Sequence, residues 1–118
     1  MVKIKRIYEP AAPDDGRRIL VDRLWPRGLS REAARIDIWM KEIAPSDDLR
    51  HWYGHDRQRW DEFRRRYREE LRGQASLLEE LCRDARQGAV TLLFAAQDTE
   101  HSNAAALKEI LESFTKES

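Results

Sequence analysis

Three runs of residues along this chain have the length and the side chains of β-strands. The first, residues 2–8, mixes apolar and basic side chains, and the second, residues 18–23, has an apolar centre. The third, residues 89–95, is apolar on both faces, as a central strand of a parallel sheet must be. Proline and glycine follow each of the first two runs, so the pattern predicts turns there.

Apolar residues at helical spacing fill most of the chain between the second and third runs. The clearest pattern lies in residues 56–72, where charged side chains occupy the positions between the apolar ones. The recurring apolar residues there are Trp60, Phe63, Tyr67 and Leu71. We expect an amphipathic helix that packs on the sheet through these side chains. Gly73 is expected to bend or break it before a second helical stretch that ends at Gly88.

Capping residues predict three further helices. Ser30 precedes a short helical turn that reaches residue 35, and Ser46 precedes a helix that Gly54 ends. Asp98 or Thr99 is expected to cap the last helix. Its buried stripe would be Ala104, Leu107, Ile110, Leu111 and Phe114.

Strands separated by helices predict a small α/β fold with an open, largely parallel sheet and helices packed on it. Such sheets bind ligands beyond the carboxyl ends of their strands. Here those ends lead into residues 22–28, which we call the corner, and into the polar residues 97–103. We therefore expect the two polar segments to face one another across a cleft.

Composition narrows the classes of function. With 118 residues we expect one domain spanning 1–118, and a charged fraction of 37% at a formal net charge of +0 does not favour a nucleic-acid partner. Cys82, the single cysteine, is expected to be a buried apolar residue. No apolar run is long enough to cross a bilayer, and no targeting segment is evident, so we expect a cytoplasmic protein without a membrane partner. Its oligomeric state is left open.

The corner is the strongest candidate for a binding site. Arg23 and Arg27 flank the ring of Trp25, and Asp22 is placed to orient one guanidinium. Paired guanidiniums on a rigid turn suit a phosphate or carboxylate. Alternatively, the two arginines pair with nearby acids and only tie the corner to the sheet, and Trp25 fills the core or its rim.

The loop after the third strand carries the candidate groups for acid–base chemistry. His101 is the most plausible proton-transfer residue, with Asp98 beside it and Asn103 as a further ligand contact. Ser46, at a helix start, is the other candidate anion contact. The spacing of histidines and acids supports no metal site, and the chain has no cofactor-binding glycine motif.

Two hypotheses of function follow from these residues. The first is an enzyme or binding domain for a phosphorylated or carboxylated small molecule, held by the corner, with His101 and Asp98 in any acid–base step. The second is a module that binds nucleic acid or protein through Trp25, Arg27 and the arginines 64–66. We favour the first, because the special residues gather at strand ends rather than along one exposed stripe.

Four parts of the sequence together resemble the YeaO-like proteins, family 488 among the domains of unknown function. The matching parts are the corner (DRLWPRG), Trp39 with residues 41–46 and 49–50, the apolar residues of 60–71, and residues 90–95. The resemblance spans nearly the whole chain and implies a small bacterial α/β protein with no established activity. One departure lies in the loop after the last strand, where related sequences commonly have Asn, then His or Asn, whereas this chain has His101, Ser102 and Asn103 and so lacks an Asn at position 102.

Overall fold

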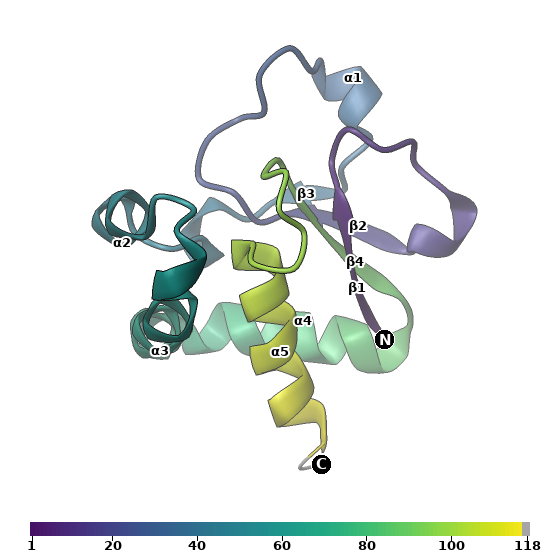
Figure 1. Ribbon diagram of the computed structural model, residues 1–118. Helices are drawn as coiled ribbons and strands as arrows, with labels where there is room; N and C mark the ends of the chain where they lie inside the picture. Colours follow the sequence, from purple (N-terminus) through teal and green to yellow (C-terminus); the bar gives the residue numbers. More distant parts are fainter. Residues whose placement is uncertain (117–118) are drawn as a thin grey trace.

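The computed structural model describes residues 1–116, whose centre is a four-stranded sheet in which all neighbouring strands are parallel (Figure 1). The strand order across the sheet is β1-β4-β2-β3. The strands are β1 (Val2–Arg6), β2 (Arg17–Leu20), β3 (Ile38–Trp39) and β4 (Val90–Phe94). The α/β fold class with a largely parallel open sheet, predicted from the hydrophobic pattern, is therefore confirmed.

The strand boundaries correct the prediction in two places. The first two strands end at Arg6 and Leu20, earlier than the apolar and aromatic residues suggested. The Val21 amide still donates to the Leu93 carbonyl, and beyond it a side chain replaces the backbone ladder, since the Asp22 carboxylate accepts from the Ala95 amide. The pattern also missed β3, because two residues are too few to show a period.

Alternate residues of the central strands face two separate cores. Ile19 and Leu92 point into the larger core, beneath the long helices. Leu20 and Leu93 point into a smaller cluster on the opposite face, which contains Ala34. Because both faces are covered, β4 is buried along its length and is apolar except for Thr91, whose hydroxyl donates to the Asp15 carbonyl.

Five α-helices surround the sheet, with α4 and α5 on one face and α1 on the other (Figure 1). The helices are α1 (Arg31–Ala34), α2 (Asp47–Tyr53), α3 (Trp60–Leu71), α4 (Ala75–Gln87) and α5 (Asn103–Lys116). Helix α5 lies on β1 and β4, whereas α3 packs chiefly against α2 and α5. The rings of Phe63 and Tyr67 still reach the core that the sheet shares, and Trp60 is half-buried.

The predicted caps of the first helices are confirmed, but the start of α5 is not. The Ser30 and Ser46 side chains accept from the amides of Ala33 and Leu49. Helix α5 begins at Asn103 rather than near Asp98, and its first turn is capped by Ser102, whose side chain accepts from the Ala105 amide at 3.1 Å. The departure of this chain at position 102 is thus compatible with a structural role for a hydroxyl.

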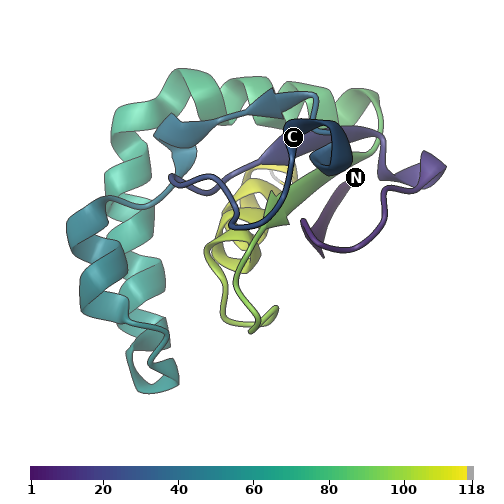
Figure 2. The same cartoon turned by 90° about the horizontal axis from the view of Figure 1, so that it is seen from above.

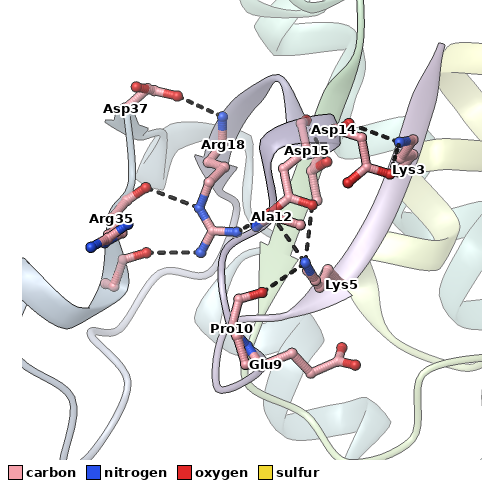
Figure 3. Close-up of polar contacts among 12 residues, drawn as sticks. Lys3, Lys5, Glu9, Pro10, Ala12, Asp14, Asp15, Arg18, Arg35 and Asp37 are labelled. Carbon is pink, nitrogen blue, oxygen red and sulfur yellow. Dashed lines mark hydrogen bonds and ion pairs between the residues drawn. The ribbon is translucent and has the colours of Figure 1, made fainter.

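A buried ion cluster joins the turn before β2 to α1 (Figure 3). The Asp15 carboxylate accepts from Arg18 at 2.5 Å and from Lys5 at 3.0 Å. Arg18 also donates to the carbonyls of Ala34 and Arg35 at the end of α1. Burial alone would raise the pKa of Asp15, but the hydrogen bonds from the Ala12 amide, Lys5 and Arg18 outweigh it and lower that pKa to about 2.

None of the helices within residues 1–116 combines the length and the apolar character that crossing a membrane requires.

Candidate ligand-binding cleft

A cleft of about 740 Å³ opens beyond the carboxyl ends of β2 and β4. Its walls are the corner, the loop of residues 95–102 after β4, and side chains from α2 and α3. Figure 2 shows the corner passing close to the end of β4, with α2 and α3 to one side. This is the position where parallel α/β sheets hold ligands, and the two polar segments of the sequence do meet there.

Asp22 joins three elements at the inner side of the cleft. Its carboxylate accepts from the Ala95 amide at 2.8 Å and from Nδ2 of Asn103 at 3.1 Å. Asn103 also donates to the Val21 carbonyl, so the start of α5 is fastened to the end of β2. Burial raises the pKa of Asp22, against the lowering effects of those two donors and of the nearby charge of Arg50.

The expectation that Asp22 orients an arginine of the corner is wrong. Arg23 instead donates to the carbonyls of Pro45 and Ala44, both at 3.3 Å, and its Nε lies 3.9 Å from the Asp47 carboxylate. Asp22 does not pair with Arg23, and its two oxygens instead accept from the Ala95 amide and from the Asn103 side chain. Arg23 therefore ties the corner to the segment before α2.

Arg27 differs from Arg23 in having a free guanidinium. Among residues 1–114, whose side chains the structure describes, its side chain has no hydrogen-bond or ion-pair partner, although its carbonyl accepts from the Tyr8 hydroxyl at 3.0 Å. The residue is exposed and lines the cleft. A third arginine, Arg50 of α2, also lines the cleft, and its guanidinium pairs with the exposed Asp47 at 3.2 Å.

Trp25 is more a packing residue than a free stacking surface. Its indole N–H donates to the Leu29 carbonyl at 2.7 Å, and its ring meets Trp39 edge-on with centroids 5.3 Å apart. The Arg31 guanidinium lies 4.8 Å from the Trp25 ring centroid. The ring thus stiffens the corner while one side of it borders the cleft.

Asp98 and His101 form a hydrogen-bonded pair in the loop that closes the cleft. His101 Nδ1 lies 3.1 Å from both carboxylate oxygens of Asp98, which also accepts from Arg57 at 2.8 Å. Burial opposes ionisation of Asp98, but the bonds from His101 and Arg57 lower its pKa to about 2. The His101 ring meets Trp60 edge-on, with centroids 5.2 Å apart.

The structure does not bring Ser46 into this cleft. The Ser46 amide and hydroxyl both donate to Glu70 of α3, and its oxygen caps α2. Ser46 borders a separate shallow depression that Glu70 also lines, where the carboxylate would repel an anion. The prediction of Ser46 as an anion contact of the cleft is therefore wrong, since a capping motif alone does not tell which side of a helix faces the ligand.

Sequence reasoning missed three residues that line the cleft from α2 and the turn after it: Arg50, Tyr53 and His55. Tyr53 donates its hydroxyl to the His101 carbonyl at 2.8 Å, and burial together with the charge of Asp98 raises its pKa to about 12. The only sequence signal for any of these three residues was that Arg50 lies within the family motif. Pattern analysis could not place α2 beside the corner.

Within the described part of the chain, no three histidine, cysteine or acidic side chains lie close enough to hold a metal ion. Cys82 is a buried free thiol on α4, as its helical surroundings predicted.

The arginines 64–66 each have an acidic partner. Arg64 pairs with Asp61 and Glu109, and Arg65 and Arg66 both pair with Glu62. A helix face neutralised in this way offers little net positive charge to a phosphate backbone.

The parallel open sheet with helices packed on it and a cleft at its strand ends defines a small α/β protein. The chain belongs to the family DUF488-N3i, described as the inactive DUF488-N3 subclade, whose sequence model matches residues 1–118.

Relatives of known sequence agree with this assignment. The chain is 44% identical to an uncharacterized protein of Mycobacterium tuberculosis over 110 residues, which cover 93% of this chain and 92% of that protein. It is 38% identical to the uncharacterized protein YeaO of Escherichia coli over 112 residues, covering 95% and 97% of the two chains. The YeaO-like resemblance of the motifs is thereby confirmed. No solved structure matches the chain.

Proposed function

We propose that this protein binds a small molecule with a phosphoryl or carboxylate group in the cleft, and that it does so without catalysing a reaction. The observation that supports this most is that Arg27 lines the cleft and that its guanidinium has no partner among the side chains of residues 1–114. The paired N–H donors of a guanidinium can bind two oxygens of a phosphoryl or carboxylate group at once. Arg50, whose acidic partner is exposed, can turn toward the same ligand.

Binding without catalysis fits the state of the candidate acid–base pair. The Asp98 carboxylate is engaged by Arg57, by two loop amides and by His101, and the His101 ring packs against Trp60. These contacts hold the loop after β4 in place, so the Asp98–His101 pair has a structural role. The description of the matching family as an inactive subclade supports the same view. A cytoplasmic location, where phosphorylated metabolites occur, is part of this proposal.

Replacing Arg27 tests the proposal. Arg27→Ala should weaken the binding of inorganic phosphate by about 10- to 100-fold, because one charge-assisted hydrogen bond contributes roughly 1.5–3 kcal/mol. Thermal unfolding without ligand should be nearly unchanged, since the side chain is exposed. The affinity is measured by isothermal titration calorimetry at low ionic strength.

The matched control is Arg83→Ala, which removes an exposed arginine of α4 that does not line the cleft. Phosphate affinity should be the same in this variant as in the parent. Equal affinities in all three proteins would show that phosphate does not use Arg27, and an absence of binding to the parent would reject the anion site.

The alternative, a nucleic-acid module, makes a different prediction for α3. On the small-molecule proposal, reversing Arg65 and Arg66 to Glu should leave any DNA or RNA association unchanged, because both side chains are already paired with Glu62. Electrophoretic mobility shifts of the parent and the variant over a range of salt concentrations measure this. Salt-dependent binding that disappears on charge reversal would favour the nucleic-acid module instead.

A further inference from the structure

We infer that the ligand of the cleft carries, besides its anionic group, a hydroxyl or ammonium hydrogen-bond donor that the Asp22 carboxylate accepts. This inference rests on the proposed anion site and adds a second group of the ligand, the hydrogen-bond donor. The class of molecule is a phosphorylated polyol or a phosphorylated amino alcohol.

The Asp22 carboxylate can accept more hydrogen bonds than it receives. Each of its oxygens accepts one bond, from the Ala95 amide and from Asn103, while a carboxylate has roughly four acceptor sites. Neither bond comes from a cation, and no Lys or Arg within residues 1–114, whose side chains the structure describes, lies at ion-pair distance from Asp22. Asp98, the other acid of the cleft, has its cation in Arg57.

The negative and positive side chains of the cleft lie at different depths. Asp22 is half-buried beside the ends of β2 and β4, whereas Arg27 and Arg50 are exposed. A partly buried carboxylate with no cation at ion-pair distance repels a bare anion and attracts a hydrogen-bond donor. A ligand that satisfies both ends must therefore place its donor inward at Asp22 and its anionic group outward at the arginines.

The volume of the cleft also favours a ligand larger than phosphate. A cleft of about 740 Å³ is within the usual range for small-molecule pockets and is far larger than a phosphate ion needs. A phosphate at the exposed arginines would leave room for the rest of a molecule beside Asp22.

Three probes that share a phosphate and a three-carbon chain test the inference by calorimetry at neutral pH. They are propyl phosphate, which has no donor on the chain, glycerol 3-phosphate, which has hydroxyls, and 3-aminopropyl phosphate, which has an ammonium. At least one donor-bearing probe should bind about 10-fold or more tightly than propyl phosphate, since a hydrogen bond to a charged group is worth that factor. The better of the two tells which donor Asp22 accepts.

Asp22→Asn should reduce the preference for donor-bearing probes to about 2-fold or less, while propyl phosphate binds at least as well as before. The control Asp48→Asn changes an exposed acid of α2 that does not line the cleft, and it should keep the full preference. If Asp22→Asn does not fold, the three probes with the parent protein still decide.

The outcomes separate this inference from the proposed function. If the three probes bind the parent equally and Arg27→Ala weakens them all, the anion site stands and the donor inference is overturned. A preference that survives in a folded Asp22→Asn protein also overturns it. If no probe binds, both are overturned.

Discussion

Asp15→Asn should lower the free energy of unfolding by about 3–5 kcal/mol at neutral pH, the usual cost of removing one partner from a buried ion pair. The substitution keeps the shape of the side chain but leaves the buried guanidinium of Arg18 without its counter-charge. It also leaves Lys5 facing Arg18. Urea unfolding at constant ionic strength measures the loss, which is a large share of the roughly 5–15 kcal/mol of a typical domain.

The same cluster makes the stability of the fold depend on pH. The pKa of Asp15 falls from 3.8 to about 2 on folding, so its ionised form stabilises the folded state. That contribution is complete above about pH 4 and is lost as the pH falls toward 2. Asp15→Asn should therefore have a flatter stability curve than the parent between pH 4 and pH 2.

The neighbouring residue supplies the control. Asp14 is exposed and pairs with the partly exposed Lys3 at 3.4 Å, so Asp14→Asn should cost about 1 kcal/mol or less. Equal losses for the two variants would contradict the assignment of Asp15 as the anion of a buried cluster.

Gly16→Ala should destabilise the fold by about 3–5 kcal/mol, the sum of backbone strain and overpacking. Gly16 has φ of 65°, a conformation that favours glycine, and it lies directly before β2. A Cβ atom at this position would lie 2.2 Å from the Ala89 carbonyl oxygen. That oxygen accepts from the Arg17 amide, so β2 and the start of β4 would be forced apart.

Gly28→Ala is the matched control, because Gly28 has a similar φ of 73° but no neighbouring atom within 4 Å of the point where a Cβ atom would lie. It should cost only the backbone term, roughly 1–2 kcal/mol. Chemical unfolding of both variants tests the comparison. A Gly28 variant as unstable as the Gly16 variant would show that φ alone, and not the contact with Ala89, sets the cost.

The sequence predicted the fold where short-range physics decides. The apolar run of β4, the helical spacing of α3 and the caps at Ser30 and Ser46 all depend on neighbours in the chain. The meeting of the corner with the loop after β4 was also predictable, because the carboxyl ends of parallel strands share one edge of a sheet.

The partners of individual side chains were not predictable, because they come from distant segments. Asp22 finds Ala95 and Asn103 rather than an arginine, and Asp15 finds Lys5 of β1. Arg50 lines the cleft because α2 lies beside the corner, a tertiary arrangement that no local pattern encodes. The fold therefore follows largely from patterning, and the chemistry of the cleft from tertiary contacts.

The most direct test of the anion site is a titration of inorganic phosphate into ¹⁵N-labelled protein, followed through the side-chain Nε–H signals of the arginines. The account predicts a saturable shift of the Arg27 signal, with a smaller shift at Arg50 and none at Arg83. An Arg27 signal that stays in place while phosphate rises to high concentration, or that moves no more than the Arg83 signal, would contradict the proposal that this cleft binds an anion.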